Sequence, residues 1–222
     1  MSENDSFDVY DNTETDLETK QVNVENNTVS VVQKRKDRIR FITGTAILTA
    51  VEIVFCFIGN YLNFGQVNIN LALIPICLAA CMYGPLSGLF IGLVNGVITI
   101  LSPSTMAFMQ FQPIATVFVC LFKTGMAGLV GGFIFKIKTK PSLLYLKVTL
   151  VALAVPFTNT LLFVLGSYVF FLDIFKSMYD GNVYVFILAM IWLNFVIEIA
   201  INIVLTPSIY KIVSKLKTKK SY

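Results

Sequence analysis

From Phe41 to its C-terminus the 222-residue chain is almost continuously apolar, and this region holds only four of the thirteen acidic residues. A helix that crosses a bilayer needs about 20 apolar residues to cover a hydrocarbon core of ~30 Å. Six stretches reach or approach that length: 41–62, 69–83, 85–101, 113–135, 147–171 and 184–212. A hydrophobic content of 56% excludes an ordinary water-soluble core. We therefore predict an all-α membrane protein, built as a six-transmembrane-helix bundle.

Lysines and arginines indicate the orientation of this bundle, because short loops rich in them stay on the cytoplasmic side. If both termini are cytoplasmic, fourteen of the seventeen basic residues lie near the inner ends of the stretches: five just before the first, four around the connection of the fourth and fifth, and five at the end of the sixth. The outer loops then hold only Lys176. This asymmetry predicts an even number of spans with both termini cytoplasmic.

The first 40 residues differ in composition from the rest of the chain. They hold nine of the thirteen acidic residues and few large apolar side chains, so they bury too little surface to offset the entropy of ordering. We predict a disordered acidic tail over residues 1–40 that ends in a basic juxtamembrane cluster. A transmembrane domain over 41–216 and a basic C-terminal tail over 217–222 follow. Nucleic acid is not favoured as a partner, because no aromatic residues are interleaved with the basic cluster.

Residues that carry enzyme chemistry are scarce. The chain has no histidine, which removes the usual proton shuttle and the commonest metal ligand. Its cysteines lie in apolar stretches and form no CxxC pair: Cys56, Cys77, Cys81 and Cys120. Serine and threonine are plentiful, but no base is placed by spacing to activate them. We expect no catalytic residue, no metal and no cofactor, and we keep a membrane-embedded enzyme and a channel-like helix bundle as alternatives to a binding protein.

Several polar side chains fall inside the predicted helices, where a charge is costly unless it has a partner or a task. With a rise of about 1.5 Å per residue, one group lies roughly 14–16 Å below the outer surface and Glu198 lies roughly 21 Å below it. The members of that group are Glu52, Lys123, Asn159 and Asn194. Asn194, Glu198 and Asn202 also share one helix face. We predict a solute pocket among the last three helices, with Lys123 meeting an anion; an ion pair of Lys123 with Glu52 or Glu198 is the structural alternative.

Two outer loops mix aromatic, amide and small residues, a composition typical of a lid over a bound ligand. The first covers 63–70 and the second 102–113. The resulting candidates for substrate binding are Asn68, Asn70, Gln112, Lys123, Asn159, Asn194 and Glu198.

Several motifs resemble one family. The run NLALIPI at 70–76, the run YGPLSG at 83–88 and the glycines Gly92 and Gly96 resemble the second and third helices of the substrate-binding S components of energy-coupling factor (ECF) transporters. The run KTGMAG at 123–128 resembles the fourth helix of that family, and Ala46 and Ala50 match its AxxxA motif in the first helix. The likeness covers about residues 41–216, whereas the acidic N-terminal tail is not a family feature.

The resemblance implies an S component in the bacterial plasma membrane that captures a vitamin or related micronutrient on the outer side with helices four to six. It also implies partners: an ECF scaffold transmembrane subunit, contacted through Ala46 and Ala50, and two cytoplasmic ATPase subunits. The chain has no GxxxxGK[ST] loop, so ATP hydrolysis is expected on a partner. Pantothenate is the favoured substrate, because the LIPI and GP elements look closest to that branch and Lys123 can meet its carboxylate. A cobalamin, a queuosine precursor and a nucleobase-type ligand stay open.

Overall fold

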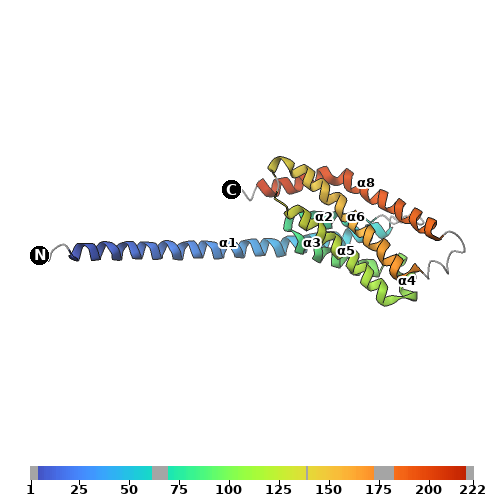
Figure 1. Cartoon of the computed structure of the whole chain (residues 1–222), viewed down its shortest axis with the longest axis horizontal. Helices are drawn as coiled ribbons and strands as arrows, with labels where there is room; N and C mark the ends of the chain where they lie inside the picture. Colours follow the sequence, from blue (N-terminus) through green and yellow to red (C-terminus); the bar gives the residue numbers. More distant parts are fainter. Residues whose placement is uncertain (1–4, 62–69, 139, 173–182, 219–222) are drawn as a thin grey trace. The chain divides into compact units, whose positions relative to one another are not determined.

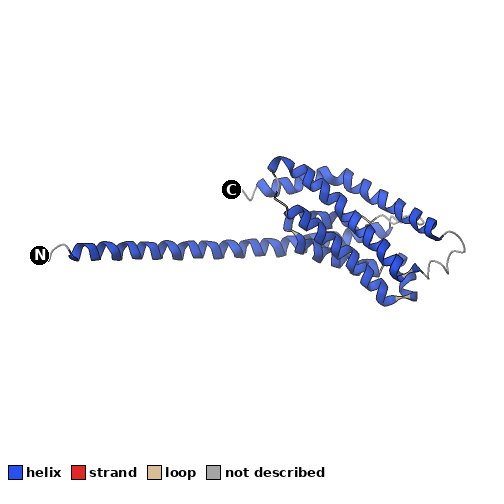
Figure 2. Ribbon diagram, viewed as in Figure 1, coloured by secondary structure: helices blue, strands red, loops and turns tan. Residues whose placement is uncertain are grey.

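The computed structural model of the protein describes residues 5–61, 70–138, 140–172 and 183–218, and its regular secondary structure in these ranges is helical (Figures 1 and 2). The helices are α1 (Asp5–Tyr61), α2 (Leu73–Tyr83), α3 (Pro85–Ile100), α4 (Pro103–Phe111), α5 (Pro113–Lys136), α6 (Leu144–Phe170) and α8 (Val183–Thr218), with a short 3-10 helix η1 (Pro141–Leu143) before α6. The predicted all-α fold is confirmed within the described residues.

Four described segments are long and apolar enough to cross a membrane: Thr28–Gly59, Pro113–Lys136, Leu144–Phe170 and Asn194–Lys215. The apolar helices α2 and α3 are shorter. With a rise of about 1.5 Å per residue, α2 covers about 16 Å, roughly half of a bilayer core of ~30 Å. The chain is thus a multi-pass membrane protein, and the count of six spans stays a prediction.

The N-terminal region differs from the expectation. The chain divides into two compact units, Met1–Thr43 and Gly44–Tyr222. Where the composition predicts a disordered tail over residues 1–40, the structure has helix from Asp5 onward. The sequence contains no proline or glycine before Gly44, so nothing in it breaks a helix there. The second unit carries the features described below.

Helix α2 lies at the centre of the apolar core of the second unit. Eight of its eleven residues are buried, and they pack against side chains of α3, α5, α6 and α8. The buried apolar residues of this core include Leu73, Ile76, Ile91, Ala127, Val148, Val151, Val155, Ile209 and Val213. Gly84 separates α2 from α3 with φ +92°, a backbone conformation that favours glycine, and Pro85 then begins α3. A core of this density holds the surrounding helices in fixed positions.

Glycines bring α3 and α5 into backbone contact. A Cβ added to Gly88 would overlap the carbonyl oxygen of Gly128, and one added to Gly92 would overlap that of Thr124. Gly132 meets Pro85 in the same way. Because lipid is as apolar as the side chains, close packing of this kind is a main source of helix association in membranes. The glycine stripe of α3 therefore acts in internal packing.

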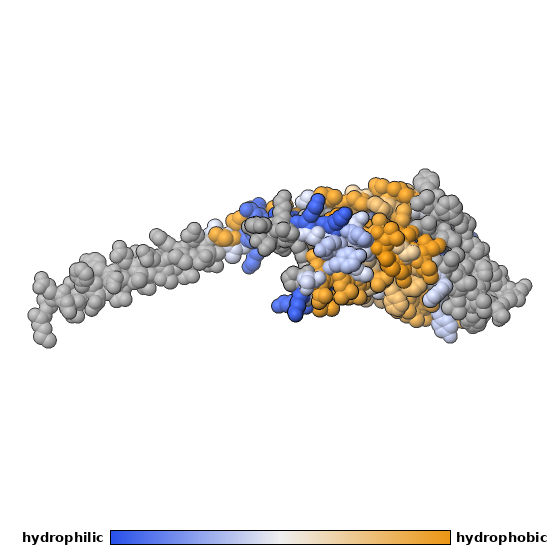
Figure 3. Space-filling model, turned by 90° about the horizontal axis from the view of Figure 1, so that it is seen from above, coloured by the Kyte–Doolittle hydropathy of each residue, from blue (hydrophilic) through white to orange (hydrophobic). Residues whose placement is uncertain are grey.

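Apolar side chains gather over the middle of the bundle in the view of Figure 3. Five of the exposed apolar side chains of α6 share one face of that helix: Leu146, Leu150, Phe157, Leu161 and Leu165. Exposed lysines gather where α5 connects to α6 and where α8 ends, two places at the same end of the bundle (Figure 1). These lysines are Lys136, Lys138, Lys140, Lys211 and Lys215. An apolar belt with cations at one end is the distribution expected of a protein that spans a bilayer.

The close contact of α3 and α5 predicts an unequal response to two small substitutions. We expect Gly92→Ala to destabilise the protein by about 1–3 kcal/mol, because its new methyl group meets backbone. Gly125→Ala is the matched control, since a Cβ there meets only the flexible ends of Leu89 and Leu93 at 3.1–3.4 Å. Thermal unfolding in detergent measures the difference, and equal melting temperatures for the two variants would contradict the backbone contact.

Candidate functional site

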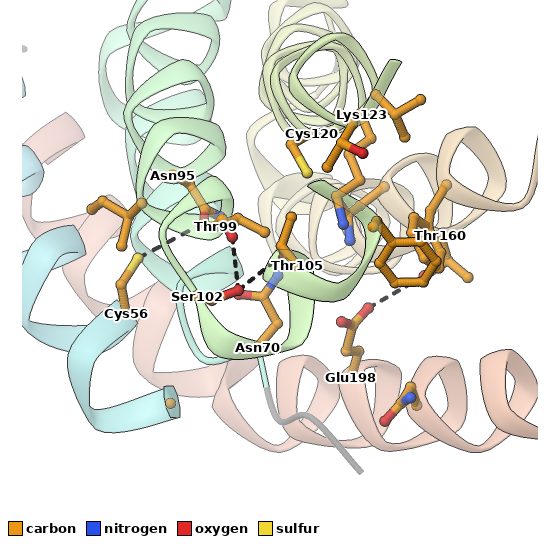
Figure 4. Close-up of a pocket in the computed structure, with 18 of the residues that line it drawn as sticks. Cys56, Asn70, Asn95, Thr99, Ser102, Thr105, Cys120, Lys123, Thr160 and Glu198 are labelled. Carbon is orange, nitrogen blue, oxygen red and sulfur yellow. Dashed lines mark hydrogen bonds between the residues drawn. The ribbon is translucent and has the colours of Figure 1, made fainter. Parts of the chain in front are cut away.

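A cavity of about 230 Å³ lies among the helices of the second unit. Its lining comes from α1, α3, α4, α5, α6 and α8 and from the segment before α2 (Figure 4). The polar lining residues are Asn70, Asn95, Thr99, Ser102, Thr105, Thr116, Lys123, Asn159, Thr160, Asn194 and Glu198. Apolar contact is provided mainly by Phe108, Val119, Phe163 and Phe171. A mixed lining with a few convergent polar groups is typical of a small-molecule site.

The charged side chains of the cavity come from two helices. Lys123 of α5 places its ammonium 4.5 Å from the centroid of the Phe163 ring, a cation–π contact. Glu198 of α8 is buried and accepts a hydrogen bond at its Oε2 from the Thr160 hydroxyl, at 3.3 Å. In Figure 4 the side chains of Lys123 and Glu198 extend toward the same space from opposite helices. The cavity therefore offers one cationic donor and one carboxyl acceptor to a ligand.

Two amides of the lining are buried with an atom that has no partner among the described residues. These atoms are Oδ1 of Asn159 on α6 and Nδ2 of Asn95 on α3. Their side chains are 4% and 1% exposed. A buried polar atom without a hydrogen bond typically costs about 1–3 kcal/mol. A ligand in the cavity could supply the missing acceptor to Asn95 and the missing donor to Asn159.

The segment 102–113, expected to be a loop, contains the helix α4. Pro103 begins α4 at a position where the missing N–H costs nothing. The hydroxyl groups of Ser102 and Thr105 lie 3.0 Å apart and both residues line the cavity. Phe108 packs on Phe171, with ring centroids 5.2 Å apart. The segment 102–113 is therefore a helical wall of the site.

The structure brings most of the predicted binding residues together. Asn70, Lys123, Asn159, Asn194 and Glu198 all line the one cavity. Gln112 is exposed at the junction of α4 and α5 and does not belong to the lining. Asn68 lies outside the described residues.

Two other polar residues of the predicted helices do not line the cavity: Glu52, which shares the predicted depth, and Asn202, which shares the helix face of Glu198. Glu52 is fully buried behind Cys56, whose Sγ lies 3.7 Å from its Oε1. Asn202 donates from Nδ2 to the carbonyl oxygen of Glu198 at 2.9 Å and receives the Cys77 thiol at its Oδ1. Both residues are buried in the packing around the site.

Sequence reasoning missed the part of the lining that α1 and α3 provide. Asn95 lies in the glycine-rich α3, and the pattern of glycines drew attention to packing alone. Cys56 follows Glu52 by one helical turn and lies 3.7 Å from Asn95 Oδ1. The signal that could have found Asn95 is the amide itself, because an amide among apolar and small residues of a membrane helix needs hydrogen-bond partners.

The two alanines of the AxxxA motif lie on the outside of α1. Ala46 and Ala50 are both exposed, whereas Gly44 and Thr45 beside them are buried. Thr45 and Ser87 share a hydrogen bond of 2.8 Å that ties α1 to α3. The small-residue face of α1 is therefore free to meet another membrane helix.

Comparison with known proteins gives one finding. A family profile described as "ECF transporter, substrate-specific component" matches residues 40–210. The comparisons with curated proteins and with solved structures give no match.

The geometry of the cavity predicts which thiols react with a small reagent. Cys56 and Cys120 line the cavity, whereas Cys77 and Cys81 lie in the apolar core. We expect a small methanethiosulfonate reagent to label Cys56 and Cys120 of the folded protein first, and all four cysteines only after denaturation. Peptide mass spectrometry reads the sites. Equal labelling of the four thiols in the folded protein would contradict the cavity.

Proposed function

This chain belongs to the family of substrate-specific components of ECF transporters, and we propose that its cavity captures an anionic, vitamin-like small molecule for uptake. The family profile covers residues 40–210 of the 222, which includes each residue that lines the cavity.

Membership defines the general role of the protein. Substrate-specific components are transport proteins rather than enzymes, and each is a substrate-binding membrane subunit. They take a small molecule and act with an ECF module, which consists of a scaffold subunit and ATPases. The chain is therefore a binding subunit that depends on partners for energy.

The observation that carries our proposal is the convergence of Lys123 with Asn159, Asn194 and Glu198 on one cavity. The ammonium of Lys123 supports an anionic group of the ligand, because it lies over the Phe163 ring and faces the same space as Glu198 (Figure 4). The buried acceptors of Glu198 and Asn159 support hydroxyl or amide N–H groups on the same ligand. A ligand with one anionic group and several neutral donors fits these features.

Pantothenate is the substrate that we favour within this class. It has one carboxylate for Lys123, and an amide and two hydroxyl groups for the acceptors. The volume of about 230 Å³ supports a small solute, since sites for drug-sized ligands span about 300–1,000 Å³. That volume disfavours a ligand as large as a cobalamin, while a queuosine precursor or a nucleobase-type ligand lacks the carboxylate that Lys123 favours.

For the topology we propose six membrane spans with both termini cytoplasmic, in a bacterial plasma membrane. The lysines at the α5–α6 connection and at the end of α8 support this orientation, because they lie at one end of the bundle. The short helices α2 and α3 complete the count as two abbreviated spans joined at Gly84.

We assign the exposed face of Ala46 and Ala50 to the scaffold subunit. Small residues four positions apart let two membrane helices approach closely. This face points away from the residues of α1 that contact α3. Binding of substrate and docking of the partner would then use different surfaces.

Replacing Lys123 tests the anion site. We expect Lys123→Met to weaken binding of pantothenate about 10- to 100-fold, because a charged hydrogen bond contributes about 1.5–3 kcal/mol. The matched control is Lys138→Met, which removes an exposed lysine between α5 and α6. Isothermal titration calorimetry on protein in nanodiscs measures both. Unchanged affinity in Lys123→Met would rule out the anion site.

Substitution on α1 tests the partner surface separately. We expect Ala46→Trp to retain substrate binding and to abolish uptake, because the indole holds the scaffold helix away. Leu161→Trp places the same side chain at an exposed position of α6 and should support uptake. The measurement is uptake of radiolabelled substrate into vesicles that contain the complete transporter. Normal uptake by Ala46→Trp would reject this surface as the site of contact with the scaffold subunit.

A further inference from the structure

The cavity has a second polar region that the proposed anion site does not use. It consists of Asn95 and Thr99 of α3 and Cys56 of α1. In Figure 4, Cys56 and Asn95 lie on one side of the cavity, and Lys123, Thr160 and Glu198 lie on the other. The two regions are therefore separate places on the wall of one space.

Hydrogen bonds occupy one end of the Asn95 amide and leave the other end without a partner among the described residues. Its Oδ1 accepts from the Thr99 hydroxyl at 3.1 Å and lies 3.7 Å from the Cys56 thiol. Its Nδ2 has no partner among the described residues, although the side chain is 1% exposed. An amide with a satisfied oxygen and an unsatisfied nitrogen presents a donor, so this region is built to bind an acceptor.

The neighbouring carboxyl group decides the charge of that acceptor. Glu52 is fully buried one helical turn before Cys56, and its Oε1 lies 3.7 Å from the Cys56 Sγ. Its Oε2 has no partner among the described residues. A carboxyl group behind the thiol disfavours a second anion here, and no lysine or arginine lines this region. A neutral oxygen suits it better.

We propose that Asn95, supported by Thr99 and Cys56, forms a second subsite that binds a neutral hydroxyl or carbonyl oxygen of the ligand at the end opposite its anionic group. The proposal rests on the proposed function, because it uses Lys123 as the site of the anion. It adds an orientation: the ligand has its charge between α5 and α8 and its neutral end at α1 and α3. Substrates that lack a neutral oxygen at that end are selected against by the unpaired amide.

The experiment compares two probes on the full-length protein in nanodiscs. Pantothenate carries the carboxylate, the amide and a neutral diol end, whereas N-acetyl-β-alanine carries the carboxylate and the amide without the diol. We expect Asn95→Leu to weaken pantothenate about tenfold and to leave N-acetyl-β-alanine unchanged, because the loss of one buried hydrogen bond corresponds to about that factor. Asn95→Asp retains the shape and the oxygen that accepts from Thr99, and we expect the same selective loss.

Each other outcome contradicts the subsite. Equal affinity of wild type and both variants for pantothenate would overturn it, as would an equal loss for both probes, which indicates a general distortion. Val97→Ala, an exposed position on the same helix, is the control and should leave both affinities unchanged. If wild type bound neither probe, pantothenate would be rejected as the substrate and this inference with it. That result differs from one in which pantothenate binds equally well to wild type and to the Asn95 variants, which would reject the subsite alone.

Discussion

The cost of a polar side chain inside a membrane determines how this structure is organised. Lipid offers no hydrogen bonds, so charged and amide groups within the apolar helices must meet one another or enclose a polar space. In this protein they enclose a space: Lys123 from α5, Asn159 from α6, and Asn194 and Glu198 from α8 surround one cavity. The outward faces of the same helices are apolar. Each of these helices thus has an apolar side that suits lipid and a polar side that lines the cavity.

Close backbone packing makes this arrangement possible. The glycines of α3 and α5 bring these helices together, and the buried helix α2 fills the space between α3, α5, α6 and α8. The contact of α3 with α5 fixes the direction in which Lys123 and Asn95 point, because each of these residues is only a few positions from a glycine in that contact. Rigid helices hold binding groups in place more accurately than loops do. Hence the packing that stabilises the fold also prepares the site.

Much of the site could be predicted from the sequence, because a constant rise per residue converts position along a helix into depth in the membrane. That reasoning grouped Lys123, Asn159 and Asn194, and the periodicity of α8 added Glu198. The expectation of a loop over 102–113 was wrong, because this segment contains α4. It also missed Asn95 and Cys56, because depth does not say which helices are neighbours or which way they face. Glu52 shares the predicted depth and still lies outside the cavity, for the same reason.

The central claim is that a small anionic molecule occupies the cavity in direct contact with Lys123. An experimental structure of the protein in a lipid nanodisc, determined in saturating pantothenate, tests this most directly. Our account predicts density for one small molecule that bridges the Lys123 ammonium and the Asn159 amide. A cavity filled by lipid or by protein side chains, with Lys123 directed away from it, would contradict the account.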